Sequence, residues 1–135
     1  MAVRTYIDSG VLISALRGGG TVGPTAQSFL YDPLREYVTS DYVKIELLPK
    51  SIFYRNEEER EFYQGFFSST KLYVPNSDEL LAFALDHGGR TGISGIDAIH
   101  VACALIAGAA ELITSEKPTK PIHRASGIKV ISINP

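Results

Sequence analysis

The feature that most constrains this chain is the stretch from residue 96 to residue 110, in which nearly every residue is apolar. The exceptions are Asp97, His100 and Gly108. A helix that is apolar around most of its circumference has to be buried on most sides, and this one is too short to cross a bilayer. We therefore predict that residues 96–110 form a buried helix at the centre of the fold.

Strand-like and helix-like segments alternate along the rest of the chain. Segments rich in β-branched and aromatic residues predict strands, and between them apolar residues recur at helical spacing. Asn56 is expected to cap one helix, and Gly88 with Gly89 is expected to end another. This alternation predicts an α/β fold, with a central parallel sheet of about four to five strands covered by helices on both faces. The predicted strands are residues 3–7, 36–39, 72–74, 111–114 and 129–133.

Length and composition limit the possible architectures and locations. With 135 residues, 44% of them hydrophobic, we expect one domain over residues 1–135 and no room for a second. The formal net charge of −2 excludes a global positive field, so local basic patches would have to hold any nucleic acid. One cysteine excludes an internal disulfide framework, and the N-terminus lacks the apolar core of a signal peptide. We expect a soluble cytoplasmic protein with no membrane partner.

Four acidic residues stand where predicted elements begin or end, and ligand sites in parallel sheets form beyond the carboxyl ends of the strands. Carboxylates gathered there repel one another by about 4 kcal/mol per close pair at an effective dielectric of about 20, unless a cation intervenes. Oxygen ligands suit Mg²⁺ or Mn²⁺ rather than zinc. The pattern predicts a four-carboxylate metal site at which a metal-activated water attacks a phosphodiester. The four acids are Asp8, Glu46, Asp97 and Glu116.

Each acid also has a structural interpretation, which the sequence leaves open. The joint placement of all four at one sheet edge favours the metal site over four separate roles. The four structural interpretations are a capping box of Ser94 with Asp97, a helix-start acid at Asp8, a salt bridge between Glu46 and Lys50 and simple exposure at Glu116.

Four short motifs follow one another in a fixed order over essentially the whole chain. They are YIDSGVL at residues 6–12, SDYVKIEL at 40–47, GIDAIHVACA at 95–104 and LITSE at 112–116. Their order and spacing resemble the PIN-domain nucleases, and in particular the small VapC-like toxin ribonucleases of toxin–antitoxin pairs. The resemblance implies a PIN-like three-layer α/β/α domain.

The resemblance also implies the chemistry, that of an Mg²⁺- or Mn²⁺-dependent endoribonuclease with one or two ions. Ser9 or Thr114 would orient the acids. The family more often has aspartate where this chain has Glu116, so the extra methylene shifts that carboxylate or places a water between it and the metal. The implied metal-binding and catalytic residues are Asp8, Glu46, Asp97 and, at the fourth acidic position, Glu116.

Other residues in or near these motifs indicate a function less specifically. His100, three residues after Asp97, can donate to a carboxylate or a phosphate, although a buried, hydrogen-bonded histidine is the commoner outcome. Cys103 is expected to be a core residue without a catalytic role. Basic residues expected to line the site and neutralise RNA phosphates are Lys50, Arg55, Lys117, Lys120 and Arg124.

The resemblance further implies an RNA substrate, a homodimer and a cognate antitoxin whose C-terminal segment blocks the site. The aromatic face over residues 53–67 is expected to make one of these protein contacts. One alternative is a catalytically impaired PIN-like module that binds RNA or protein. Another enzyme class on a similar sheet is disfavoured, because an aspartate phosphatase needs a second aspartate where Gly10 stands, and the acid pair of a receiver domain is not evident.

Overall fold

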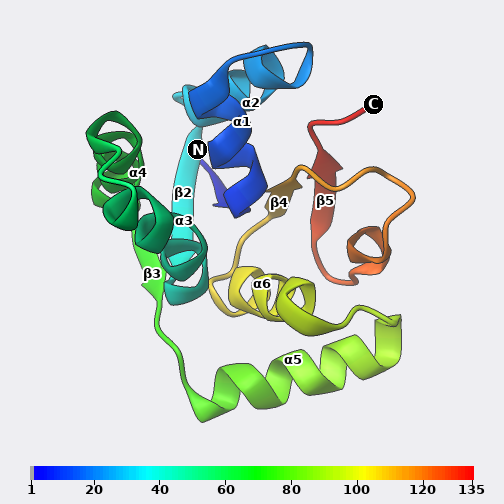
Figure 1. Ribbon diagram of the computed structural model, residues 1–135. Coiled ribbons are helices and arrows are strands. Elements are labelled where there is room, and N and C mark those ends of the chain that lie inside the picture. Colours follow the sequence, from blue (N-terminus) through cyan, green and yellow to red (C-terminus); the bar gives the residue numbers. More distant parts are fainter. Residues whose placement is uncertain (1) are drawn as a thin grey trace.

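Residues 2–135, which the computed structural model describes, form one sheet of five parallel strands in the order β3-β2-β1-β4-β5 (Figure 1). All five predicted strands are present, and each bound lies within one residue of the expected one. The strands are β1 (Val3–Ile7), β2 (Arg35–Ser40), β3 (Leu72–Val74), β4 (Glu111–Thr114) and β5 (Lys129–Ser132).

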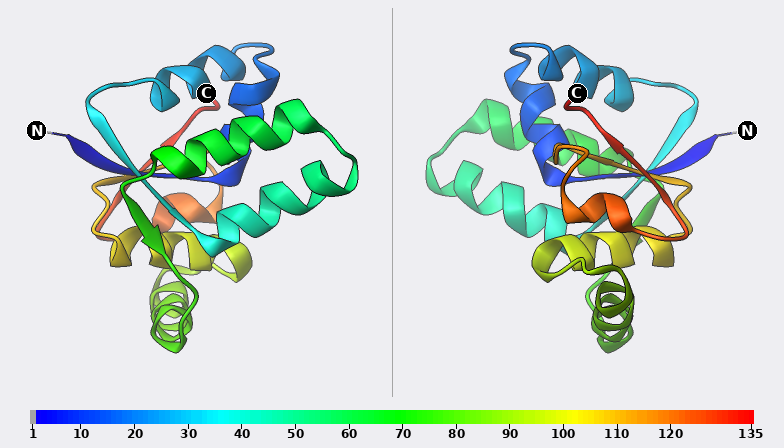
Figure 2. Two further views of the ribbon diagram at one scale, coloured as in Figure 1. Left: turned by 90° about the vertical axis from the view of Figure 1, so that its left-hand side faces the viewer. Right: turned by 90° about the vertical axis from the view of Figure 1, so that its right-hand side faces the viewer.

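Helices cover both faces of the sheet, as the α/β prediction requires. α6 lies on one face with α5 packed outside it, and α1, α2 and α4 lie on the other (Figures 1 and 2). α4 packs on β2 through the Phe66 and Tyr37 rings, whose centroids are 5.9 Å apart. The helices are α1 (Ser9–Arg17), α2 (Val22–Leu30), α3 (Asp41–Phe53), α4 (Glu57–Ser69), α5 (Asp78–Thr91), α6 (Gly95–Ile106) and the 3-10 helix η1 (Pro121–Arg124).

The apolar stretch forms the predicted central helix, but the helix is shorter than expected. α6 ends at Ile106, because Gly108 takes a left-handed φ of 70° and turns the chain into β4. Val101 and Cys103 are fully buried. Every helix within residues 2–135 is too short or too polar to span a bilayer.

The prediction that Gly88 and Gly89 end α5 was wrong. The helix continues to Thr91 and ends at Gly92, which has the left-handed φ of 79°. Gly88 is a packing residue instead, since a Cβ there would lie 2.4 Å from the carbonyl oxygen of Ile93. The sequence pattern of a glycine pair did not distinguish a helix end from a close contact between backbones.

Only part of the predicted aromatic face over residues 53–67 is exposed. Tyr63 and Phe66 turn inward and are 2% and 9% exposed, so they belong to the core. Phe53 and Tyr54, at the end of α3, are 78% and 72% exposed. Asn56 caps α4 as predicted, with its side chain accepting the Glu59 N–H. The aromatic surface that is free for a partner is therefore smaller than expected.

Candidate active site

The site lies at the carboxyl edge of the sheet, where the strand order reverses between β1 and β4. After β1 the chain adds β2 and β3 on one side, and after α6 it adds β4 and β5 on the other. A crevice forms at such a reversal because the connections leave in opposite directions. Ile7 pairs with Ile113, so Asp8 and Thr114 lie side by side just beyond the paired residues.

Asp8 is held on both carboxylate oxygens. Its Oδ1 accepts the Ser9 N–H at 2.7 Å as the N-cap of α1, and its Oδ2 accepts the Thr114 hydroxyl at 3.0 Å. The side chain is 10% exposed. Gly10 lets α1 begin this close to the end of β4, since a Cβ at Gly10 would lie 2.0 Å from Ser115 Oγ.

Glu46 reaches the same crevice from the second turn of α3. Its Oε1 lies 2.6 Å from His100 Nε2 and accepts the Ser9 hydroxyl at 3.2 Å. The side chain is 34% exposed, so one side of this carboxylate faces solvent. Among residues 2–135, Glu46 makes no ion pair with Lys50, which rejects the structural interpretation of a solvated helix pair.

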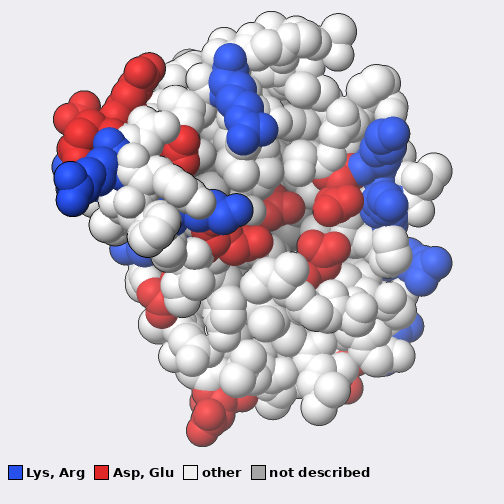
Figure 3. Space-filling model, in the orientation of Figure 1, with Lys and Arg blue, Asp and Glu red and all other residues white. Residues whose placement is uncertain are grey.

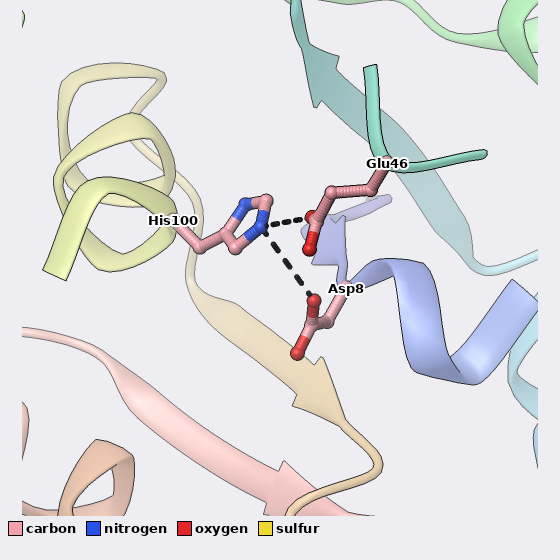
Figure 4. Close-up of side chains that lie close together, drawn as sticks. All are labelled: Asp8, Glu46 and His100. Carbon is pink, nitrogen blue, oxygen red and sulfur yellow. Dashed lines mark hydrogen bonds and ion pairs between the residues drawn. The ribbon is translucent and has the colours of Figure 1, made fainter. Parts of the chain in front are cut away.

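His100 completes a cluster of three groups (Figure 4). Its side chain is 1% exposed, and its Nε2 lies 3.8 Å from Asp8 Oδ1 in addition to the short contact with Glu46. One potential ligand atom from each of the three residues lies within 4.8 Å of the others. On the far side of the ring, Nδ1 lies 2.7 Å from the Tyr6 hydroxyl.

Asp97 lies within the electrostatic reach of the other acids. Burial raises the pKa of Asp97, and the charges of Asp8, Glu116 and Glu46 raise it further, while that of His100 lowers it. Ser94 makes no side-chain cap hydrogen bond at the start of α6, so the capping-box interpretation of Asp97 is not supported. At the Asp97 carboxyl the negative charge of the neighbouring acids therefore outweighs the positive charge of His100.

Glu116 follows β4 on an anchored loop. Its backbone N–H donates to Thr114 Oγ1 at 3.1 Å. Its carbonyl oxygen accepts the Ser132 hydroxyl at 2.6 Å and lies 3.1 Å from His123 Nε2. The backbone of Glu116 is thus fixed beside Asp8, and its half-buried side chain contributes to the charge at Asp97.

Opposite pKa shifts mark the contact between Glu46 and His100. Burial alone would raise the pKa of Glu46, but the hydrogen bond and charge of His100 and the hydrogen bond of Ser9 bring it below its ordinary value. Burial alone would lower the pKa of His100, but the Glu46 hydrogen bond and the charges of Asp8, Glu46 and Asp97 raise it. The two directions express one contact, in which the Glu46 carboxylate favours the charged imidazole and the imidazole favours the charged carboxylate.

The donor set fits a divalent cation. Within residues 2–135, no lysine or arginine nitrogen lies within 4.0 Å of a carboxylate oxygen of Asp8, Glu46, Asp97 or Glu116. Acidic side chains gather in a hollow of this face, with basic side chains on either side (Figure 3). Carboxylates that converge without a lysine or arginine partner are an environment that Mg²⁺ or Mn²⁺ would stabilise.

The structure brings the predicted acids to one edge of the sheet, and their role as metal ligands stays a prediction. From the sequence, His100 was predicted as a possible hydrogen-bond donor but not as one of the site residues. The signal available was its position three residues after Asp97, one turn along the same helix face. Of the predicted basic residues, Arg124 lies against Gly92 at the C-terminal end of α5. The contributions of Lys50, Arg55, Lys117 and Lys120 stay predictions.

Comparison with known proteins gives one family match. The model of the PIN domain family matches residues 5–118, which include the four acids and His100. A search of curated proteins finds no sequence match.

Solved structures with this fold include chains of three bacterial complexes. One is VapBC2 from Rickettsia felis bound to a DNA fragment from its promoter, with a TM-score of 0.70, 14% identity and coverage of 96% of this chain and 98% of that chain. A toxin–antitoxin complex from Klebsiella pneumoniae gives 0.68, 20% identity and coverage of 96% and 97%. DNA-bound VapBC from Salmonella typhimurium gives 0.67, 14% identity and coverage of 97% and 98%. At these identities the likeness establishes the fold.

Proposed function

The chain belongs to the PIN domain family, and from that premise we propose that it is a metal-dependent ribonuclease that hydrolyses RNA phosphodiester bonds. The observation that carries the proposal is the convergence of Asp8 and Glu46 on one crevice. They come from different elements, and Ser9 lies between them, with its hydroxyl 3.5 Å from Asp8 Oδ1 and 3.2 Å from Glu46 Oε1. Burial and then the neighbouring carboxylates raise the pKa of Asp97, which supports the proposal that a bound cation balances the negative charge of the site.

The acids would hold one or two Mg²⁺ or Mn²⁺ ions. Asp8, Glu46 and Asp97 supply the oxygen ligands, and Glu116 supplies a fourth, either directly or through a water. When bound, the ion lowers the pKa of a coordinated water and neutralises charge on the phosphodiester. The proposal needs no protein nucleophile.

The chain's own residues supply orientation and access. Thr114 and the Ser9 N–H fix both oxygens of Asp8 before any ligand arrives, so little reorganisation is needed on binding. The exposed side of Glu46 leaves one wall of the crevice open to a strand of RNA. Basic side chains on either side of the hollow would neutralise its phosphates (Figure 3).

We further propose that the protein is the toxin of a toxin–antitoxin pair and acts as a homodimer. The support is the fold shared with chains of VapBC and toxin–antitoxin complexes. An apolar groove of about 660 Å³ between α2, β2 and α4 is suited to an antitoxin segment, with Leu30, Tyr31, Phe62 and Phe66 in its walls. The exposed pair Phe53 and Tyr54 is available for the contact between copies.

The test is RNA cleavage by the purified protein, freed of any antitoxin, with and without Mn²⁺. Cleavage should require the ion, stop with EDTA and leave no 2′,3′-cyclic phosphate, because water rather than the 2′-hydroxyl attacks. Asp8→Asn should reduce the rate by more than about 100-fold yet fold normally, since asparagine is as good an N-cap as aspartate.

The matched control is Asp86→Asn, which changes an exposed acid on α5 and should leave cleavage unchanged. A rate for Asp8→Asn equal to that of the wild type refutes the assignment of the site. Binding of Mn²⁺ and RNA without cleavage would identify the chain as a non-catalytic binding module.

A further inference from the structure

We propose that His100 Nε2 is a direct ligand of the metal, which makes the centre a mixed nitrogen and oxygen site, and that Tyr6 and Ser40 are positioning residues for the imidazole. The inference rests on the proposed function, because it assumes that the acidic cluster binds a divalent cation. It assigns to His100 a role beyond that of a buried hydrogen-bonding residue.

The distances at the cluster suit one ion in contact with all three side chains. Bonds of about 2.1 Å in octahedral geometry place neighbouring ligand atoms about 3.0 Å apart and opposite ones about 4.2 Å apart. His100 Nε2 lies 2.6 Å from Glu46 Oε1 and 3.8 Å from Asp8 Oδ1 (Figure 4). A small outward shift of the partly exposed Glu46 carboxylate is enough to admit the ion between these atoms.

The imidazole is fixed in this orientation by burial and by a second contact. The side chain of His100 is 1% exposed, so Nε2 cannot turn away from the crevice without disturbing the core. A metal-bound histidine usually gives its other N–H to a fixed acceptor, which sets the tautomer. Here Nδ1 lies 2.7 Å from the Tyr6 hydroxyl, which in turn lies 2.7 Å from Ser40 Oγ.

The two hydroxyls accommodate both tautomers of the ring. In one arrangement Nδ1–H donates to Tyr6 and Tyr6 donates to Ser40, which leaves the Nε2 lone pair for a metal. In the other, Ser40 donates to Tyr6, Tyr6 donates to Nδ1, and Nε2–H donates to Glu46. Hydroxyl protons rotate freely, so a bound ion can select the first arrangement without moving a heavy atom of His100, Tyr6 or Ser40.

The Ser40 hydroxyl contacts Tyr6 instead of capping α3. Ser40 is the N-cap residue of α3, yet its side chain makes no cap hydrogen bond. A serine side chain at this position normally stabilises the helix by accepting one of its first N–H groups. The hydroxyl points instead to Tyr6, which is fully buried. The chain thus keeps a polar pair in its core directly behind the imidazole.

A nitrogen ligand also changes which metal is preferred. Imidazole binds transition-metal ions more strongly than it binds Mg²⁺, whereas carboxylates bind both Mg²⁺ and Mn²⁺. The wild type should therefore prefer Mn²⁺ over Mg²⁺ by about 10-fold or more. The variant His100→Gln should lose most of that preference, because it leaves only oxygen and amide groups.

The experiment is pulsed electron paramagnetic resonance of Mn²⁺ bound to the untagged protein in a nitrogen-free buffer. Electron spin-echo envelope modulation detects a directly bound ¹⁴N nucleus, and the chain has three histidines. The ¹⁴N coupling should be present in the wild type, absent in His100→Gln and unchanged in the control His87→Gln, which changes a histidine of α5 that contacts Ser126. Tyr6→Phe, which keeps the ring and removes the hydroxyl, should weaken Mn²⁺ binding by about 10–100-fold. Circular dichroism melting checks that each variant folds.

The outcomes separate the two proposals. Mn²⁺ binding without ¹⁴N coupling in the wild type, or with coupling that persists in His100→Gln, overturns the role of His100 and leaves the ribonuclease proposal standing. Failure of the wild type to bind Mn²⁺ at all overturns both. The wild-type spectrum alone shows whether a nitrogen binds the ion, so a missing signal overturns the role of His100 whether or not a buried variant folds, and the His100→Gln spectrum shows whether that nitrogen belongs to His100.

Discussion

The Thr114 hydroxyl donates to Asp8 Oδ2 at 3.0 Å, across the carboxyl ends of the neighbouring strands β4 and β1. Thr114 Oγ1 in turn accepts the backbone N–H of Glu116 at 3.1 Å. One fully buried hydroxyl therefore connects two of the acidic residues that sequence analysis selected. Its position follows from the parallel register, which places residue 114 beside residue 8.

Removal of this hydroxyl should weaken metal binding through Asp8. Thr114→Val keeps the shape of the side chain but leaves Asp8 Oδ2 and the Glu116 N–H without their partner. We expect a loss of about 1–3 kcal/mol in the free energy of unfolding and about 10-fold weaker Mn²⁺ binding. Urea denaturation and calorimetry measure the two effects.

Thr39→Val is the matched control for that substitution. Thr39 is fully buried on β2, and its Oγ1 has no hydrogen-bond partner among residues 2–135. Replacing an unsatisfied hydroxyl with a methyl group should leave stability unchanged or raise it. Equal losses in the two variants would show that the Thr114 hydrogen bonds do not orient the site.

The substitution Asp97→Asn should stabilise the protein without metal and destabilise it, relative to the wild type, when metal is bound. Because burial and neighbouring carboxylates raise the pKa of Asp97, folding favours its protonated form. This contribution to stability is present at low pH and is lost as the pH rises through the raised pKa. In EDTA at neutral pH, the asparagine variant should therefore melt higher than the wild type.

With saturating Mn²⁺ the order should invert. The wild type gains stability from the bound ion, by about 2.7 kcal/mol at 100 times the dissociation constant, and the variant lacks a ligand. Differential scanning calorimetry in both buffers gives the four melting temperatures. A variant that melts below the wild type in EDTA would show that Asp97 is a structural residue.

The buried thiol of Cys103 should make the protein sensitive to alkali. Burial raises the pKa of Cys103 from 9.0 to about 11, so the unfolded chain loses this proton at lower pH than the folded one. Stability is fully present below about pH 9 and falls between pH 9 and pH 11, with a slope approaching about 1.4 kcal/mol per pH unit. Urea denaturation between pH 9 and pH 10, below the range in which Tyr6 and Tyr63 with their raised pKa also contribute, measures the slope, and Cys103→Ala should reduce it.

At the opposite edge of the sheet, Glu111 should matter for stability alone. It accepts the Thr5 hydroxyl at 2.9 Å and Arg35 Nε at 2.6 Å, and its side chain is 10% exposed. Glu111→Ala should lower the free energy of unfolding by about 2–3 kcal/mol, because it leaves buried partners unpaired. The exposed pair Asp86 and Arg90 is the control, where Asp86→Ala should cost less than about 0.5 kcal/mol. Cleavage per folded molecule should not change in either variant.

Local sequence patterns were sufficient for the elements of the fold. β3 and β4 begin and end at the predicted residues, because short β-branched and aromatic runs between turn residues have few other solutions. The end of α5 was wrong because local pattern does not report on packing. The contact between Gly88 and the Ile93 carbonyl exists only after α5 and α6 come together.

For the candidate site, the sequence supplied the acids but not their partners. Motif order and the positions of acids at element ends selected Asp8, Glu46, Asp97 and Glu116. Nothing local indicated that Ser40 would direct its hydroxyl to Tyr6 or that Tyr6 would meet His100 Nδ1. These contacts join three elements, and each residue taken alone has a commoner role as a cap, a strand residue or a core histidine.

The sequence by itself determined the α/β class, the parallel sheet and which acids stand at its carboxyl edge, because periodicity and chain order fix where each strand ends. Only the tertiary structure decided that His100 approaches Glu46 to within 2.6 Å, 54 positions away along the chain. That contact depends on how α3 and α6 both lie against β2 and on the burial that holds the ring in place. Distances between side chains are set by packing, which no local pattern encodes.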